Sequence, residues 1–158
     1  MIGSLTLPSE PVEDRSAKPP SLRSEGYERV IVDGLNALGS RPDGWWRDRP
    51  RAMGRLVARL AALAAEEPGL AVEVVFDGRP HDGVLEQASA SVEIAFAGGG
   101  ANAADREIAA RVRAAEHPAQ VLVVSSDRRL AASVKAAGGV CVGAGGFVRQ
   151  RLGPAQEG

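Results

Sequence analysis

Runs of branched apolar residues alternate with segments of helical periodicity from residue 29 onward. Between the first two runs, apolar residues recur every three or four positions from Met53 to Ala64, which is typical of one apolar helix face. Pro68 and Gly69 end that helix. The apolar runs predict buried strands at VIVDG from residue 30, AVEVVFD at 71–77, SVEIAFA at 91–97, QVLVVSS at 120–126 and VCVG at 140–143.

Two further helices are predicted in the second half of the chain. The first follows the glycine-rich stretch AGGGANAAD, and the second follows the fourth strand and ends at Gly138 and Gly139 in a left-handed cap. Their apolar faces carry Ile108, Ala109 and Val112 in the first and Leu130, Ala131 and Val134 in the second. Strands that alternate with helices at this spacing predict a three-layer α/β/α sandwich with a mostly parallel central sheet.

The ends of the chain differ in composition from its middle. Residues 1–27 are rich in proline and charged residues and offer little apolar surface, so they predict a disordered N-terminal tail. Residues 28–152 form the predicted domain, which closes with the last strand and an arginine-bearing segment after it. Residues 153–158 are expected to be a disordered C-terminal tail. Residues 39–50 and the polar stretch RPHDGVLEQASA are expected to be loops.

Composition narrows the class of protein. With 158 residues, 44% of them apolar and 25% charged, the chain fits one domain with a sizeable core. Cys141 is its only cysteine, so neither an intramolecular disulfide nor a zinc site built from thiolates is expected, and a reducing cytoplasm is the natural compartment. No apolar stretch approaches the roughly 18 to 20 residues that span a bilayer, and no leader sequence is expected. The net charge of −1 lacks the global basicity of many nucleic-acid binders.

Four aspartates stand where strands pass into loops or helices. Asp33, Asp77 and Asp127 follow apolar runs, and Asp105 lies at the start of a predicted helix. The carboxyl ends of parallel strands share one edge of a sheet, where open α/β proteins keep their sites. Carboxylates brought together repel one another, and a divalent cation relieves that repulsion by accepting oxygen ligands. The pattern therefore predicts a Mg²⁺ or Mn²⁺ site for phosphodiester chemistry.

Asp33 and Asp77 also have a purely structural explanation. Asp-Gly after a strand is favoured in ordinary turns for backbone reasons. Against this, Asn36 follows Asp33 by three residues and can donate from its amide to a phosphate or orient the carboxylate. Gly34 would allow the backbone to approach a ligand closely.

Asp105 and Asp127 have a structural alternative in helix capping. Asn102 could be an N-cap with Asp105 at the third helical position, where its charge is favourable. Asp127 could likewise be a first-turn acid that follows Ser126 as N-cap.

Arginines and tryptophans cluster in the loop that leaves the first strand. Arg41 and Arg47 flank Trp45 and Trp46, a combination that suits single-stranded nucleic acid through phosphate pairing and base stacking. Arg79 follows the second strand and could also contact a phosphate. The alternative is that the tryptophans cover the core and the arginines are solvated.

Motifs of other chemistries are missing from the sequence. It contains no Gly-x-Ser-x-Gly elbow, no phosphate-binding Gly-x-x-x-x-Gly-Lys-Ser/Thr loop, and no Gly-x-Gly-x-x-Gly after the first strand. Its two histidines are too isolated to suggest a histidine-based metal centre.

Five blocks, in order, give the chain a family resemblance. VIVDGLNALGS, VEVVFDG, VEIAF, ANAADREIA and VLVVSSDRRL resemble the YacP-like NYN domain family within the PIN-like nuclease superfamily. The resemblance implies a PIN-like α/β fold, a divalent metal and endoribonuclease activity. Carried over position by position, it implies Asp33, Asp105 and Asp127 as the principal acidic residues, with Asp77 and Asn36 in support.

The leading hypothesis is a metal-dependent endoribonuclease that acts on single-stranded RNA, with carboxylates that hold Mg²⁺ or Mn²⁺. Asp33, Asp77, Asp105 and Asp127 would be the metal residues, and Asn36, Arg41, Arg47 and Arg79 would bind substrate. One alternative is a non-catalytic RNA-binding module on the same fold. Another is a small-molecule phosphatase with Asp33 as nucleophile, which is disfavoured because Leu35 stands where a second aspartate is usual.

Overall fold

The computed structural model describes residues 19–41 and 43–152, and its centre is a five-stranded sheet in which every pair of neighbouring strands is parallel. Val32 on the central strand lies opposite Val74 on one side and Val124 on the other. The five predicted strands are confirmed, and the sheet is parallel throughout. In spatial order the strands are β3 (Val92–Phe96), β2 (Ala71–Phe76), β1 (Arg29–Asp33), β4 (Val121–Val124) and β5 (Val140–Val142).

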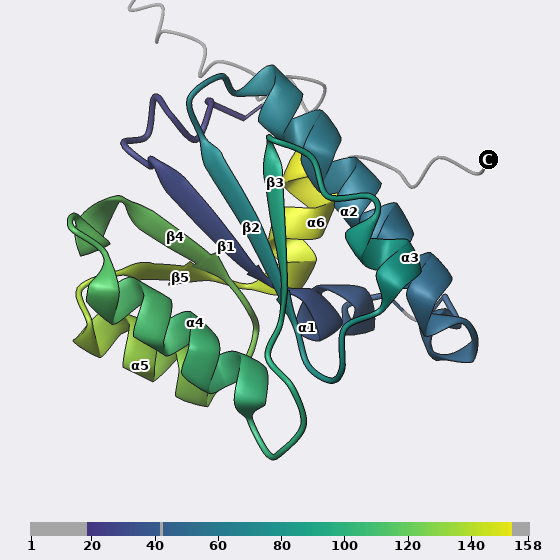
Figure 1. The fold of residues 1–158 in the computed structure, drawn as a ribbon. Coiled ribbons are helices and arrows are strands. Elements are labelled where there is room, and N and C mark those ends of the chain that lie inside the picture. The colour runs from purple at the N-terminus through teal and green to yellow at the C-terminus, as the bar shows by residue number, and fades with distance from the viewer. Residues whose placement is uncertain (1–18, 42, 153–158) are drawn as a thin grey trace, which may run out of the picture.

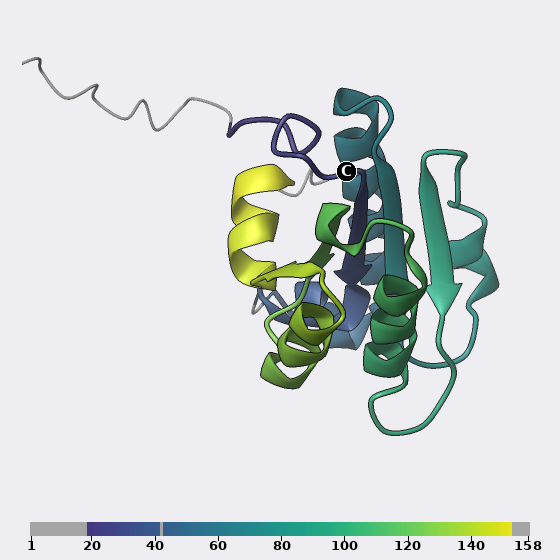
Figure 2. The ribbon, with the colours of Figure 1, turned by 90° about the vertical axis from the view of Figure 1, so that its left-hand side faces the viewer.

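Helices cover both faces of the sheet and complete three layers (Figures 1 and 2). One face carries α1 (Gly34–Gly39), α2 (Arg49–Glu66), α3 (Asp82–Leu85) and α6 (Ala144–Arg151), and the other carries α4 (Ala103–Ala114) and α5 (Arg128–Ala136). Two 3-10 turns, η1 (Trp45–Arg47) and η2 (Pro118–Gln120), lie in the connections. None of the helices in the described ranges is long and apolar enough to cross a bilayer.

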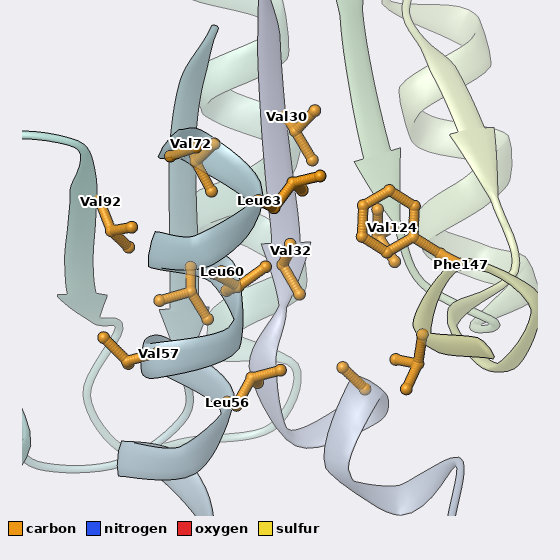
Figure 3. Packing of buried hydrophobic residues seen from close by; sticks show 14 of the residues in the cluster. Val30, Val32, Leu56, Val57, Leu60, Leu63, Val72, Val92, Val124 and Phe147 are labelled. Carbon is orange, nitrogen blue, oxygen red and sulfur yellow. The ribbon is translucent and has the colours of Figure 1, made fainter. Parts of the chain in front are cut away.

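Alternation along the strands divides the core into two clusters. Successive strand residues point to opposite faces, so Val32 packs with Leu60 of α2 and Phe147 of α6 (Figure 3), while Ile31 packs with Ile108 of α4 on the other face. Each such side chain contributes roughly 1.5–3 kcal/mol by leaving water. The two clusters fix the helices against the sheet and thereby fix the loops at its edges.

The structure differs from the sequence prediction in its helical connections. Residues 144–151, expected to be an arginine-bearing tail, form α6, because Ala144, Phe147 and Val148 share one buried face. Gly145 and Gly146 lie between them and hide this pattern in the sequence. Short helices also occupy segments expected to be turns or loops, as α1, η1 and α3.

Part of the segment expected to be a disordered N-terminal tail lies on the domain. Leu22 is 1% exposed and belongs to the core cluster with α2 and α6, and Tyr27 packs against that cluster. The Glu67 carboxylate accepts a hydrogen bond of 3.0 Å from the backbone N–H of Arg23. These two apolar side chains and the hydrogen bond to Glu67 therefore hold residues 19–27 against the domain. Residues 1–18 and 153–158 of the two expected tails lie outside the described residues.

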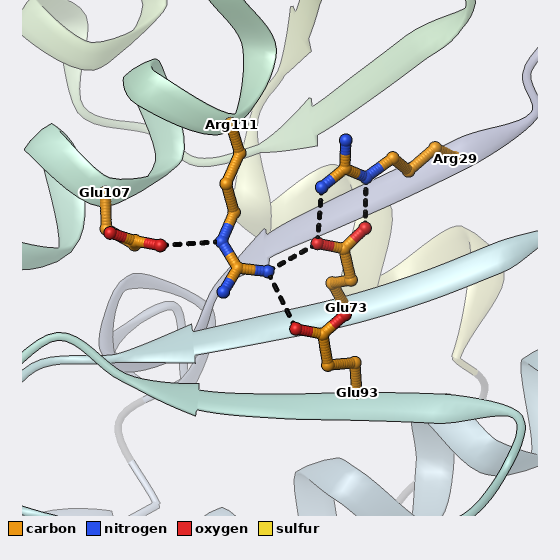
Figure 4. Close-up of polar contacts among 5 residues, drawn as sticks. All are labelled: Arg29, Glu73, Glu93, Glu107 and Arg111. Atoms are coloured by element: carbon orange, nitrogen blue, oxygen red, sulfur yellow. Dashed lines mark hydrogen bonds and ion pairs between the residues drawn. The ribbon is translucent and has the colours of Figure 1, made fainter. Parts of the chain in front are cut away.

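A network of charged side chains spans the face of the sheet beside α4 (Figure 4). Glu73 of β2 is 4% exposed and pairs with Arg29 of β1 and with Arg111 of α4, whose Nη1 lies 2.6 Å from Oε1. Arg111 also contacts Glu93 of β3 at 3.1 Å and Glu107 at 2.9 Å. Because a buried carboxylate requires partners, this network allows Glu73 to occupy an otherwise apolar strand.

Candidate active site

The four aspartates predicted to converge line one cleft at the carboxyl edge of the sheet. The cleft has a volume of about 580 Å³ and an open, mostly polar wall. Its lining residues are Asp33, Leu35, Asn36, Gly39, Ser40, Asp77, Asn102, Asp105, Ser126 and Asp127.

Strand order explains why the cleft forms where it does. From β1 the chain proceeds to β2 and β3 on one side, and then crosses to β4 and β5 on the other side. The connections that leave β1 and β4 therefore diverge, which opens a crevice beyond the carboxyl ends of these two strands. Asp33 ends β1, and Asp127 begins α5 just after β4. The topology thus brings together carboxylates that are far apart in the sequence.

Asp33 is the most deeply buried of the four carboxylates, with 5% of its surface exposed. Its Oδ2 accepts a hydrogen bond of 2.8 Å from the Ser125 hydroxyl. The pKa of Asp33 is raised to about 6, chiefly by burial; the Ser125 hydrogen bond opposes the increase, and the negative charges of Asp105 and Asp77 add to it. Burial and carboxylate repulsion therefore both disfavour the ionised form of Asp33, and a nearby cation would restore it.

Asp105 lies in the first turn of α4, and its side chain lines the same cleft. Burial raises its pKa, the charges of Asp127 and Asp77 add to that increase, and Arg129 opposes it. Within the described ranges, no donor forms a hydrogen bond with the Asp105 carboxylate. Its oxygens are therefore not occupied by the protein's own hydrogen bonds there.

Asp77 and Asp127 each use one carboxylate oxygen to cap a helix. Asp77 Oδ1 accepts from the backbone N–H of Ala104 at 3.0 Å, at the start of α4. Asp127 Oδ1 accepts from the backbone N–H of Leu130 at 2.9 Å and is the N-cap of α5. Both acids therefore have a structural role in addition to facing the cleft.

These caps differ from the ones that the sequence predicted. Asn102 precedes α4 but has a left-handed backbone, with φ of 59°, and its side chain makes no capping bond. Asp77, from a distant strand end, takes its place. At α5, Asp127 is itself the N-cap, in the position expected for Ser126.

Asn36 and two serines hold the loops around the cleft together. Asn36 Oδ1 accepts from the backbone N–H of Ser126 at 2.8 Å, and Ser126 Oγ accepts from the backbone N–H of Ala144 at 2.9 Å. Ser125 Oγ, besides donating to Asp33, accepts from the backbone N–H of Asp127 at 3.1 Å. Sequence reasoning missed Ser125 and considered Ser126 only as a helix N-cap, although the pair of hydroxyls directly before Asp127 was a signal that could have found both.

The three arginines predicted to bind substrate lie outside the cleft wall. Arg47 and Arg79 are exposed, and Arg41 is half-buried beside a smaller pocket formed by α1, α2 and α6. The guanidinium carbon of Arg47 lies 6.0 Å from the centre of the Trp46 ring. Of the two tryptophans predicted as possible core cover, Trp46 is 53% exposed and Trp45 is half-buried.

The donor set of the cleft fits a hard divalent cation that keeps part of its water shell. Carboxylate and amide oxygens suit Mg²⁺ and Mn²⁺. In the part of the chain that the structure describes, no three His, Cys, Asp or Glu side chains come close enough to enclose one ion. Mg²⁺ is commonly held by one or two carboxylates together with waters and substrate phosphates, so this spacing agrees with such a site.

The fold of this chain, a parallel α/β/α sandwich whose carboxylates line the carboxyl edge, matches the PIN-like class of folds. Within this class the chain belongs to the YacP-like NYN domain family, whose model matches residues 30–152. This family is generally one of nucleases, with functions related to RNA. The predicted family and fold are thus confirmed.

Two crystal structures of Rae1 (YacP) from Bacillus subtilis resemble this fold. One superimposes with a TM-score of 0.61 and 24% identity, over 76% of this chain and 71% of the other. The second, a tryptophan-to-leucine mutant, gives a TM-score of 0.60 and 24% identity, over 79% and 72%. At this identity the likeness concerns the fold. A search of curated protein sequences found no match.

Proposed function

We propose that this protein is a divalent-metal-dependent endoribonuclease that hydrolyses phosphodiester bonds of single-stranded RNA in the cleft. The observation that carries the proposal is that four aspartates from separate elements line one cleft, where burial and mutual repulsion raise the pKa of Asp33 to about 6. Membership of a generally nucleolytic family supports it. The single cysteine suits a reducing cytoplasm as the place of action.

Asp33 and Asp105 would be the main metal-holding residues. Asp77 and Asp127 would contribute through oxygens directed to the cleft, while each keeps its helix-capping bond. When bound, Mg²⁺ or Mn²⁺ lowers the pKa of a coordinated water and offsets charge on the phosphate. Ser125 keeps the Asp33 carboxylate in a fixed orientation toward the cleft.

Substrate contacts are assigned to residues around this centre. The Oδ1 of Asn36 is engaged with Ser126, which leaves its amide nitrogen as the group that would donate to a phosphate oxygen. Arg41, Arg47 and Arg79 would hold the strand beyond the cleft through phosphate contacts. Such contacts release counterions, so affinity for RNA is expected to fall steeply with salt.

A non-catalytic RNA-binding module is the second candidate function. The observation that favours it is that no three candidate ligand side chains gather around one point in the described ranges. In that case, neutralising an aspartate should strengthen RNA binding, because it removes repulsion of phosphate. The nuclease therefore predicts cleavage that is lost in the aspartate variants, whereas the binding module predicts no cleavage by the parent and stronger binding by the variants.

The decisive experiment measures cleavage of labelled single-stranded RNA and matched DNA with Mn²⁺, Mg²⁺ or EDTA. The parent is compared with Asp33→Asn and Asp105→Asn. Glu116→Gln is the matched control, since Glu116 follows α4 at the opposite edge of the sheet and is exposed. Metal-dependent RNA cleavage that both cleft variants abolish and the control retains would support the nuclease. Binding without cleavage in every condition would favour the binding module.

A further inference from the structure

The most exposed large apolar side chain in the described ranges belongs to Trp46. It lies in η1 between α1 and α2 and is 53% exposed. Trp45 packs against it edge to face, with ring centres 6.4 Å apart and planes at 88°. The edge of one ring therefore supports the other, and the Trp46 ring remains accessible to solvent. A large accessible aromatic surface at a fixed position is a candidate contact surface.

The surroundings of the two tryptophans are basic. Residues 43–55 contain four arginines against two aspartates. Arg47 lies over the Trp46 ring at 6.0 Å and Arg49 lies over the Trp45 ring at 5.5 Å. Guanidinium groups over aromatic rings hold the side chains in place and add positive charge beside the exposed ring. The surface thus combines an aromatic face with groups that can pair with phosphates.

This surface continues from the wall of the cleft. Gly39 and Ser40 line the cleft at the end of α1. A β-carbon on Gly39 would lie 4.0 Å from the Trp45 ring, so the tryptophan pair begins where the cleft wall ends. Figure 1 shows the connection between α1 and α2 at the same end of the molecule as the carboxyl ends of the strands. A chain that leaves the cleft past Gly39 would reach Trp45 and then Trp46.

We propose that Trp46 is a stacking site for a nucleobase of single-stranded RNA, with Arg47 pairing with an adjacent phosphate. The site would hold a part of the substrate outside the cleft, so this inference rests on the proposed function. Stacking needs an unpaired base, whereas the bases of a duplex present only their edges. Charge complementarity favours RNA over an apolar protein partner, because the arginines attract the negatively charged phosphates of the RNA backbone.

Intrinsic fluorescence isolates this loop, since Trp45 and Trp46 are the only tryptophans in the chain. The parent protein is titrated in EDTA, which prevents metal-dependent cleavage, with a single-stranded 12-mer RNA. An abasic oligomer of equal length and a duplex RNA are the comparison ligands. Quenching by the single strand, but not by the abasic oligomer or the duplex, is expected, because only the first offers accessible base faces.

Variants test the contribution of each side chain to binding, measured by fluorescence anisotropy of labelled RNA in EDTA. Trp46→Ala should weaken binding about 5-fold to 100-fold, and Trp46→Phe should recover most of it. Arg47→Ala should weaken binding and lower the slope of log affinity against log salt by about 1. Arg113→Ala is the matched control, because Arg113 is an exposed arginine in the last turn of α4 and should leave binding unchanged.

The outcomes separate this inference from the proposed function. RNA binding or cleavage by the parent that Trp46→Ala leaves unchanged would overturn the stacking site and keep the nuclease. Equal quenching by abasic and normal oligomers would assign the loop to charge alone and overturn stacking. Self-association that Trp46→Ala abolishes, without an effect on RNA binding, would assign the surface to protein contact. A parent that neither binds nor cleaves RNA would overturn both proposals.

Discussion

The Ser125 hydroxyl donates a hydrogen bond of 2.8 Å to Oδ2 of Asp33 and so joins the ends of β4 and β1. Ser125 Oγ also accepts a hydrogen bond from the backbone N–H of Asp127 at 3.1 Å. One side chain therefore fixes both the orientation of a buried carboxylate and the start of α5. Because a hydrogen bond to the ionised form lowers the pKa of an acid, Ser125 also limits how far burial raises the pKa of Asp33.

Ser125→Ala should raise the pKa of Asp33 above its value of about 6, since the opposing hydrogen bond is lost. Fewer Asp33 carboxylates would be ionised at neutral pH, so the acidic limb of the pH–rate profile for RNA cleavage should move to higher pH. The free energy of unfolding should also fall by about 1 kcal/mol. Measurement of cleavage rates between pH 5 and 9 at Mn²⁺ concentrations well below saturation, where ionisation of Asp33 governs metal binding, tests the shift.

Ser125→Thr keeps the hydroxyl and should keep the parent profile, while Ser91→Ala removes an exposed hydroxyl far from the cleft and is the matched control. An unchanged acidic limb in Ser125→Ala would show that this hydrogen bond does not control the ionisation of Asp33.

The raised pKa of Asp33 makes its contribution to stability dependent on pH. Between the usual value of 3.8 and the folded value of about 6, the folded protein binds more protons at Asp33 than the unfolded chain does. The free energy of unfolding attributable to Asp33 therefore falls as pH rises through this window and stays low above it. In EDTA, Asp33→Asn should raise the free energy of unfolding at pH 7.5 by at most about 3 kcal/mol, with no gain at pH 3.5.

Urea unfolding of parent and variant at both pH values measures this difference, with Glu116→Gln as the control. Addition of Mg²⁺ or Mn²⁺ should raise the melting temperature of the parent more than that of Asp33→Asn, because a cation bound to the folded state offsets the carboxylate repulsion. A metal-induced shift that is equal in the two proteins would place the binding site elsewhere.

The sequence was sufficient to predict the sheet and the meeting of four aspartates, because branched apolar runs mark buried parallel strands and these strands end at one edge. It did not predict α6, because Gly145 and Gly146 stand between Ala144 and Phe147 and obscure the apolar face that these two residues share. Leu22 was missed for a related reason. A single apolar residue among polar ones has no periodicity, and its burial depends on the groove that α2 and α6 provide.

The hydrogen bonds of the site could not be predicted, because they depend on how distant loops meet. Asp77 caps α4 across 27 residues, and Asn36 accepts from Ser126 across 90. Local sequence favoured Asn102 as the cap of α4, but its left-handed backbone turns the side chain away from that role. Capping rules that use only neighbouring residues do not include such tertiary caps.

The tertiary cap gives Asp77 a measurable structural contribution. Asp77→Ala removes the acceptor for the Ala104 N–H and should lower the free energy of unfolding by roughly 1–2 kcal/mol. Asp77→Asn retains an acceptor oxygen and should lose less, although it lacks the charge that favours a helix N-terminus. Urea unfolding compares the two variants. Equal stability of Asp77→Ala and the parent would contradict the capping role.

Arg111 should be the most sensitive residue of the charged network, because it joins Glu73, Glu93 and Glu107. Arg111→Met leaves the buried Glu73 with Arg29 as its remaining partner and should cost roughly 3 kcal/mol of unfolding free energy. The loss should appear first in α4, where faster hydrogen exchange would separate it from unfolding of the whole domain.

The network also affects the cleft, because α4 carries Asp105 in its first turn and Arg111 about 1.7 turns later. Loosening α4 in Arg111→Met should therefore weaken the Mn²⁺-induced rise in melting temperature. Arg113→Met removes an exposed arginine of the same helix and is the control. It should change the free energy of unfolding by no more than about 0.5 kcal/mol and leave the Mn²⁺-induced rise unchanged. Unchanged exchange in α4 and an unchanged response to Mn²⁺ would show that packing of Ile108 and Val112 against the sheet alone holds the helix in place.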